Sequence, residues 1–87
     1  KTPVMVLDEA ARRVYGVPPD YQLISEVVPA FGFSCRLMNR NATGSGKTKK
    51  AAKQQAARAL LHELIEADLQ LEFGIPGETK QAAHQAV

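Results

Sequence analysis

The 87-residue chain is long enough for one small domain with a single modest core, and too short for two domains. It contains no apolar run as long as a membrane span and no segment laid out like a signal peptide, so we expect an intracellular protein, cytoplasmic or alternatively nuclear, with no membrane partner. Its single cysteine, Cys35, excludes an internal disulfide, and together with His62 and His84 it makes no metal-ligand cluster, so we expect no metal ion and no cofactor.

The net charge of +2 conceals two oppositely charged segments. Residues 40–58 carry lysines and arginines without any acid, whereas residues 63–78 carry acids without any lysine or arginine. A local excess of positive charge, rather than the net charge, decides what a domain attracts. The basic segment therefore predicts a polyanionic partner.

The first predicted element is a helix over residues 3–15. Thr2 supplies a capping hydroxyl, and Pro3 suits the first helical position, where its missing N–H costs nothing. One stripe at spacings of three and four is expected to face the core: Val4, Leu7, Ala11 and Val14. A second stripe is expected to be exposed: Met5, Asp8, Glu9 and Arg12.

Three strands are predicted next. The alternation of apolar and polar residues predicts strands over residues 21–26 and 31–38, with Cys35 on the covered face as a core residue. Residues 39–41 are predicted to turn the chain, and residues 42–45 to return as a short third strand.

A second helix of about eighteen residues is predicted to begin at Thr48, with a broad apolar arc rich in alanine and leucine. His62 is expected on its exposed side. Residues 67–87 are predicted to be a linker or C-terminal extension, in which residues 78–87 can form a short helix. The order helix, three antiparallel strands, helix predicts an α+β fold over residues 1–66, written α-β-β-β-α, with both helices packed on one face of a three-stranded antiparallel sheet.

The basic segment meets the start of the second helix at Gly44-Ser45-Gly46-Lys47-Thr48-Lys49-Lys50. Free N–H groups and the positive dipole end of a helix attract anions, and lysines at the same place reinforce this attraction. The run therefore predicts a ligand that carries phosphates. A nucleotide-hydrolysing loop would need glycine where Asn41 stands, so we expect neither ATP or GTP hydrolysis nor a small-molecule substrate.

Glycines, lysines, alanines and leucines recur in the pattern Gly44-x-Gly46-x-Thr48-Lys49-Lys50-x-Ala52-Lys53-x-x-Ala56-Ala57-x-x-x-Leu61-x-x-Leu64. This pattern resembles the C-terminal half of the double-stranded RNA-binding domain. The start, Thr2-Pro3-x-x-x-Leu7-x-Glu9, resembles the first helix of that family, and Pro29-x-Phe31-x-Phe33 resembles its second strand. More narrowly, the opening KTPVMVLDEAARRVY and the later IPGETK are similar to domains of Dicer-partner proteins in RNA interference.

The resemblance implies a non-catalytic module that binds double-stranded RNA through its A-form shape and its phosphates, and not an enzyme. It also implies two sets of RNA contacts. The first helix would meet a minor groove through Thr2, Met5, Asp8 and Glu9, although the family usually carries Gln or Asn at the position of Asp8. The start of the second helix would meet phosphates across the major groove through Lys47, Thr48, Lys49, Lys50 and Lys53.

One feature of the family has no match in this sequence. In the family, the loop between the first two strands contains a Gly-Pro-x-His segment that enters a second minor groove, and residues 26–30 contain no such segment. We therefore expect a footprint shorter than the roughly 16 base pairs typical of the module.

The resemblance also implies protein partners and leaves alternatives open. We expect a parent protein that acts in RNA interference beside a Dicer-type nuclease, or that self-associates through another part of its chain. Alternatively, the domain is a protein–protein interaction module used for dimerisation or Dicer docking, or it targets an RNA-editing deaminase to its substrate.

Overall fold

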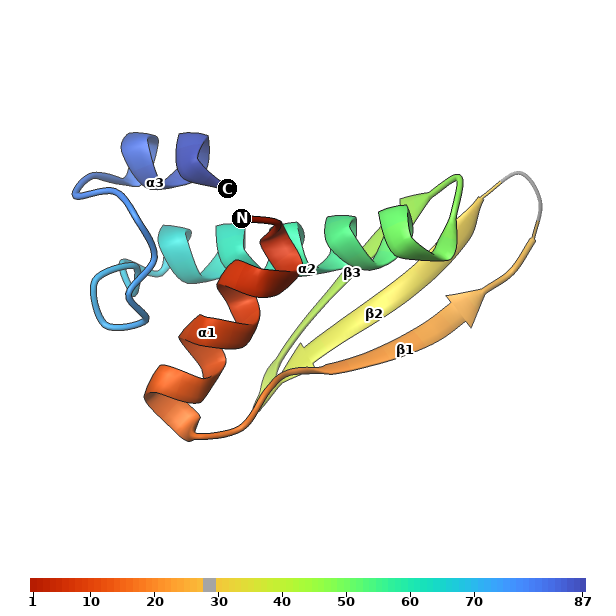
Figure 1. The fold of residues 1–87 in the computed structure, drawn as a ribbon, viewed down its shortest axis with the longest axis horizontal. Coiled ribbons are helices and arrows are strands. Elements are labelled where there is room, and N and C mark those ends of the chain that lie inside the picture. The colour runs from red at the N-terminus through yellow and green to blue at the C-terminus, as the bar shows by residue number, and fades with distance from the viewer. Residues whose placement is uncertain (28–29) are drawn as a thin grey trace.

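The computed structural model describes residues 1–27 and 30–87. The elements follow one another as α1 (Pro3–Tyr15), β1 (Asp20–Ser25), β2 (Phe31–Leu37), β3 (Arg40–Gly46), α2 (Lys49–Glu66) and α3 (Lys80–Ala86), as Figure 1 shows. The strands form one antiparallel sheet in the order β1-β2-β3. The predicted α+β fold is therefore confirmed, with a short third helix added at its end. No helix in the described part of the chain is long and apolar enough to cross a membrane.

The hairpin between β2 and β3 is tighter than predicted. Leu37 pairs with Arg40, so Met38 and Asn39 alone form the turn, and β3 begins at Arg40 instead of residue 42. Met38 takes a φ of 57°, because a two-residue turn between twisted strands requires positive φ. The prediction of a turn at residues 39–41 was wrong because it relied on the tolerance of asparagine for that conformation.

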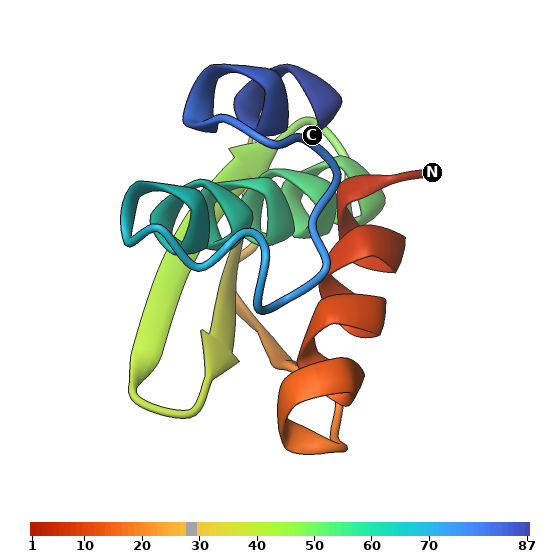
Figure 2. The same ribbon diagram turned by 90° about the vertical axis from the view of Figure 1, so that its left-hand side faces the viewer.

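The core lies between the sheet and the two long helices. α2 lies across β2 and β3, while α1 packs beside α2 (Figure 2). Leu7 and Ala11 of the predicted stripe are fully buried, and Cys35 is a core residue as predicted. Val4 and Val14 are partly buried against this core. The buried face of α1 is wider than predicted, since it also includes Val6 and Ala10.

Two glycines of β3 bring the strand into direct contact with the backbone of α2. A Cβ atom on Gly44 would lie 2.2 Å from the Ala56 nitrogen, and one on Gly46 would lie 2.7 Å from the Ala52 nitrogen. Real Cβ atoms do not approach so closely, so any side chain at either position would push α2 off the sheet. The glycines of the basic run therefore serve strand–helix packing.

The segment after α2 contacts the core, although a linker or extension was expected there. Phe73 and Ile75 are 2% and 3% exposed, and the Phe73 ring lies edge-on to that of Tyr15 with centroids 5.8 Å apart. α3 then lies on the side of α2 away from the sheet, with Ala83 buried (Figures 1 and 2). That residues 67–87 link the domain to a longer chain stays a prediction.

Candidate nucleic-acid interface

The start of α2 presents a group of lysines that we call the lysine cluster, made up of Lys47, Lys49, Lys50 and Lys53. All but Lys53 are exposed, and Lys53 is half-buried. Thr48 is the N-cap of the helix, and its Oγ1 accepts a hydrogen bond of 3.0 Å from the Ala51 N–H. β3 ends at Gly46, directly before Lys47. The close packing of Gly46 on α2 therefore also positions the start of the lysine cluster.

Lys53 is held against the sheet by an aromatic ring. Its Nζ lies 4.6 Å from the ring centroid of Tyr21 on β1, within the range of a cation–π interaction. The Tyr21 hydroxyl oxygen is buried and has no hydrogen-bond partner within the described chain. Burial raises the pKa of this phenol well above its ordinary value, so the ring stays neutral beneath the ammonium.

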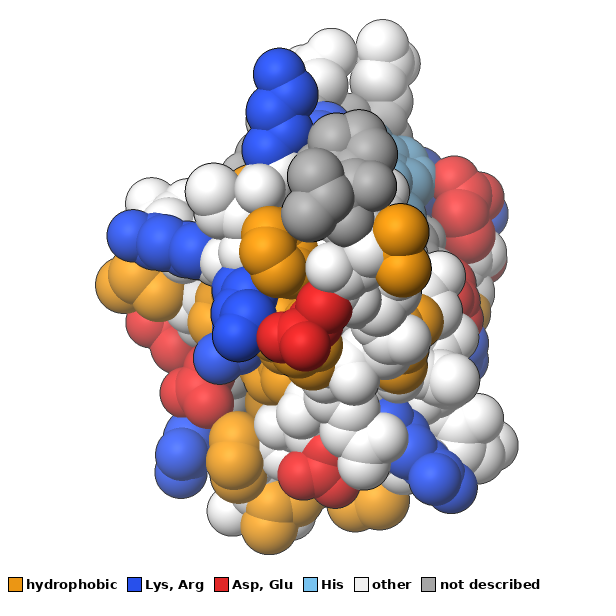
Figure 3. Space-filling view, turned by 90° about the vertical axis from the view of Figure 1, so that its right-hand side faces the viewer, with side chains coloured by type: hydrophobic (Ala, Val, Ile, Leu, Met, Phe, Trp, Pro, Cys, Tyr) orange, Lys and Arg blue, Asp and Glu red, His pale blue; other side chains and the backbone are white. Residues whose placement is uncertain are grey.

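Lys49 is paired with an acid from the end of β1. Its Nζ lies 3.2 Å from Oε1 of Glu26, and both side chains are more than half exposed, at 58% and 60%. Basic and acidic side chains touch near the centre of Figure 3, which looks at this end of the molecule. Within residues 1–27 and 30–87, Lys47 and Lys50 make no salt bridge to a carboxylate.

The exposed side of α1 carries the other predicted set of RNA contacts, which we call the α1 stripe: Thr2, Met5, Asp8 and Glu9. Met5 is 50% exposed, so it offers an apolar surface to a partner. Thr2 caps the helix, since its Oγ1 accepts a hydrogen bond from the Met5 N–H at 3.3 Å.

Both carboxylates of the α1 stripe have cationic partners. Asp8 accepts a hydrogen bond of 3.0 Å from Arg12 Nε, and Glu9 pairs with Lys1 Nζ at 2.7 Å. The charge of Asp8, which departs from the family pattern, is therefore largely balanced by Arg12, so its repulsion of a nearby phosphate is weakened.

The α1 stripe and the lysine cluster meet in one shallow groove of about 500 Å³, lined by residues of α1, of the loop after it, of β1 and of α2. The groove includes Met5, Asp8 and Glu9 on one side and Lys53 on the other. The helices are joined nearby, because Oε1 of Gln54 accepts a hydrogen bond of 3.0 Å from the Val4 N–H. The structure therefore places residues from both predicted sets on one continuous surface.

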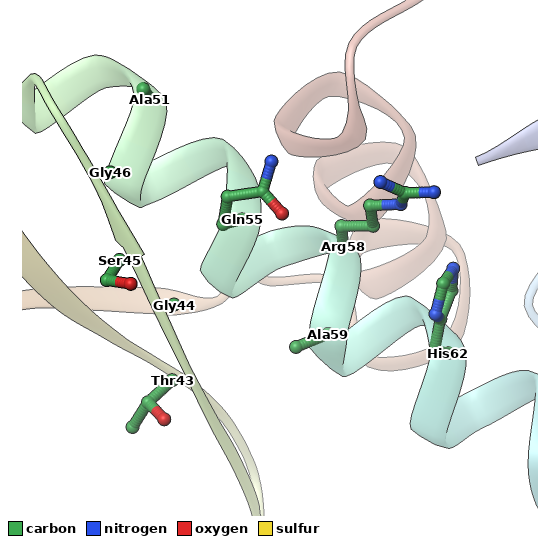
Figure 4. A pocket seen from close by; sticks show the side chains of 9 residues that line it. All are labelled: Thr43, Gly44, Ser45, Gly46, Ala51, Gln55, Arg58, Ala59 and His62. Atoms are coloured by element: carbon green, nitrogen blue, oxygen red, sulfur yellow. The ribbon is translucent and has the colours of Figure 1, made fainter.

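A second hollow, of about 460 Å³, lies between β3 and the middle of α2 (Figure 4). None of the lysine cluster lines it. Gln55, Arg58 and His62 project from α2, and Thr43 to Gly46 run along the facing strand. A single arginine gives this hollow far less positive charge than the lysine cluster has.

His62 was expected to be exposed and is instead half-buried, because the ring of His84 on α3 covers it edge-on at a centroid distance of 4.5 Å. His62 Nε2 has no hydrogen-bond partner in the described part of the chain. Burial lowers the pKa of His62, and the nearby His84 and Arg58 lower it further, against a smaller opposing effect of Glu66.

Cys35 is fully buried on β2, and burial raises the pKa of its thiol to about 11. A thiol that stays protonated at neutral pH and is closed to solvent is a poor nucleophile. The sulfur therefore contributes packing to the core.

The predicted loss of a second minor-groove contact concerns residues 26–30. Residues 28 and 29 lie outside the described part of the chain, so this stays a prediction.

Sequence reasoning missed three residues that organise the interface: Tyr21, Glu26 and Gln54. Each acts on a residue distant in the sequence, so no local pattern marks it. Tyr21 alone gave a signal, as an aromatic residue in a predicted strand.

Comparison with known proteins identifies a family with this fold. Residues 3–64 match the family model described as the double-stranded RNA binding motif. Protein Loquacious of Drosophila melanogaster is 39% identical over 77 residues, which cover 79% of this chain and 16% of that protein. RISC-loading complex subunit tarbp2 of Xenopus laevis is 38% identical over 79 residues, which cover 86% of this chain and 21% of that protein.

A solved structure is also similar. The solution structure of RDE-4(32-136) has a TM-score of 0.82 and 37% identity, covering 97% of this chain and 79% of that one. The agreement in fold therefore extends beyond α2 to the C-terminal segment. The chain itself spans 16% and 21% of the length of the two curated relatives.

Proposed function

This chain belongs to the double-stranded RNA binding motif family, and on that premise we propose that it grips an A-form duplex with the α1 stripe and the lysine cluster together. It is a non-catalytic binding module. A-form RNA has a deep, narrow major groove closed to side chains, and a wide, shallow minor groove lined by 2′-hydroxyls. Such a duplex is recognised by its shape, with little sequence preference.

The α1 stripe would lie in a minor groove. Met5 offers an apolar surface to base edges, and the Glu9 carboxylate can accept a hydrogen bond from a 2′-hydroxyl in exchange for its exposed partner Lys1. Thr2 and Asp8 border the same contact. B-form DNA lacks both the 2′-hydroxyl and the wide minor groove, so this surface would provide the discrimination between RNA and DNA.

The lysine cluster would contact phosphates on the two sides of the adjacent major groove. The exposed ammonium groups of Lys47, Lys49 and Lys50, beside the N-terminus of α2 and its cap Thr48, form a positive surface without an acid on the helix's own first turn. Phosphate neutralisation of this kind dominates affinity and makes it fall steeply with salt.

The observation that carries this proposal is the groove shared by Met5, Asp8, Glu9 and Lys53. A single surface built from both helices suits a ligand that offers a groove and a line of phosphates together. The lysine cluster favours a row of phosphates over a protein partner, because lysine is depleted in protein–protein interfaces.

The parent protein is also part of the proposal. The similar protein tarbp2 is named as a RISC-loading complex subunit, and the matched segment is a small part of that longer chain. We infer a longer parent that works in RNA interference, in the cytoplasm, and presents duplex RNA to a Dicer-type nuclease. Other segments of that parent would supply any self-association.

Fluorescence anisotropy with matched RNA, DNA and RNA–DNA hybrid duplexes, each at several lengths and two salt concentrations, tests the proposal. We expect binding to RNA well above binding to DNA, and saturation on duplexes shorter than about 16 base pairs. Lys50→Ala should weaken binding about fivefold, and lower the slope of log affinity against log salt by about one. Equal affinity for RNA and DNA would contradict shape recognition.

Lys80→Ala is the matched control, since it removes the same charge from α3, where Lys80 pairs with Asp68 at 3.4 Å. It should leave RNA affinity nearly unchanged. If the two variants behaved alike, the lysine cluster would not be the contact surface, and a pull-down with a Dicer-type helicase domain would then test the protein-interaction alternative.

A further inference from the structure

We propose that Glu26 competes with RNA for Lys49. Its carboxylate pairs with the Lys49 ammonium in the free domain and must move away when a phosphate binds there. This inference rests on the proposed function and adds a residue that sets its affinity.

Glu26 forms an ion pair with a member of the lysine cluster. Its Oε1 lies 3.2 Å from Lys49 Nζ, within salt-bridge distance, and Lys49 is the first residue of α2. The carboxylate is therefore paired with a lysine of the first turn of α2, one of the cations proposed to contact phosphates. Glu26 is also the acid that the fold supplies to this end of α2, since the first turn of the helix contains none.

The backbone around Glu26 favours this pairing. Glu26 directly follows β1, whose last residue, Ser25, pairs with Gly32 of β2. The Val27 N–H then donates to Ser25 Oγ at 3.4 Å, a long hydrogen bond that spans Glu26. The strand end therefore presents the carboxylate to Lys49, and the side chain needs only a rotamer change to move away.

A phosphate and the Glu26 carboxylate cannot share Lys49 without repelling each other at close range. Binding of a duplex therefore has to break the ion pair. Both side chains are more than half exposed, so the pair is weak, and its loss would cost a modest factor in affinity, about two- to fivefold. Salt screens the exposed pair, so its cost to RNA binding falls as the salt concentration rises, and this makes the salt dependence of the wild-type chain less steep.

The test is Glu26→Gln, measured against duplex RNA by anisotropy over a range of salt concentrations. We expect affinity to rise about two- to fivefold at low salt, with a steeper salt dependence than the wild-type chain. Glu63→Gln is the matched control, because it removes the same charge from the exposed far end of α2. It should change affinity by much less.

The double variant with Lys49→Ala separates ion pairing from general repulsion. If Glu26 acts through Lys49, its removal in the Lys49→Ala background should give no more gain than Glu63→Gln does. A gain that persists there would overturn the proposal, as would a loss of affinity in Glu26→Gln alone, which would mean that the pair holds the interface in its binding shape. Thermal unfolding of each variant checks that the fold is intact.

The two proposals fail in different ways. If Lys50→Ala weakens RNA binding but Glu26→Gln matches Glu63→Gln, then the competition alone is wrong. If Lys50→Ala has no effect on RNA binding, the proposed function is wrong.

Discussion

The ammonium of Lys53 on α2 lies 4.6 Å above the ring of Tyr21 on β1, so a lysine of the candidate interface is positioned by the opposite layer of the fold. A lysine side chain free in solvent loses considerable rotamer entropy on binding a phosphate. The ring reduces this loss because it holds the ammonium end of Lys53 in place in the free domain.

Tyr21→Phe should therefore leave RNA affinity unchanged, since the ring that faces Lys53 stays in place. The same change removes a buried hydroxyl that has no hydrogen-bond partner in the described chain, so the free energy of unfolding should stay equal or rise by up to about 1 kcal/mol. Urea denaturation and anisotropy measure the two quantities. Tyr21→Leu is the contrast: without the ring, affinity for RNA should drop. Loss of affinity in Tyr21→Phe would show that the hydroxyl, and not the ring alone, takes part in RNA binding.

Gly44→Ala should destabilise the domain severely, by about 3 kcal/mol or more, because the new methyl group would lie 2.2 Å from the backbone nitrogen of Ala56. The exposed neighbour offers the control, since Ser45→Ala on the same strand should change stability by less than about 0.5 kcal/mol. Chemical denaturation followed by circular dichroism compares them. Similar stability of the two variants would refute the close strand–helix contact.

Phe73→Ala should lower the free energy of unfolding by about 3–5 kcal/mol, since Phe73 is 2% exposed and packs on Tyr15. Leu71→Ala, two residues earlier, removes a side chain that is 70% exposed and should have little effect. A chain shortened after residue 66 should be destabilised at least as much as Phe73→Ala. If instead the shortened chain unfolded at the same denaturant concentration as the full one, residues 67–87 would contribute nothing to the core.

His62 should make the domain less stable in mild acid. Its pKa in the folded state is below the ordinary value of 6.5, so the unfolded chain takes up a proton more readily than the folded chain does. Stability should therefore be lost as the pH falls from 6.5 through the lowered pKa. His62→Gln should flatten the difference between urea midpoints measured at about pH 7.5 and about pH 5.5. An equal fall in wild type and variant would show that His62 is not the cause.

The periodic signals in the sequence predicted the elements well. The helix over residues 3–15, the strand alternation through Phe31 to Leu37 and the helix that Thr48 caps are all local patterns, and each coincides with the structure. The fold follows from their order. The turn at Met38 was missed because the sheet, and not the turn residues, decides where pairing ends.

The candidate site was predictable only where charge and spacing mark it. The lysine cluster and the α1 stripe could be listed from the sequence, but their meeting in one groove depends on how α1 and α2 pack. The same holds for Tyr21 beneath Lys53 and for Glu26 beside Lys49, which are 32 and 23 positions apart by their residue numbers. The burial of Phe73 was unpredictable because a single aromatic residue after a helix has no periodicity to reveal it.

The hydrogen bond between Gln54 and the Val4 N–H joins α2 to the start of α1, the elements that carry the two contact surfaces. Val4 lies in the first turn of α1 and Gln54 in the second turn of α2, so the bond adds to the core packing that already holds the two helices together. If the proposed function holds, this spacing of the helices would match the grooves of an A-form duplex, and a B-form duplex would reach only one of the two surfaces. Loss of that bond should therefore reduce the discrimination between RNA and DNA before it reduces RNA affinity. Each surface would keep its own attraction for nucleic acid, but the spacing that excludes DNA would be lost.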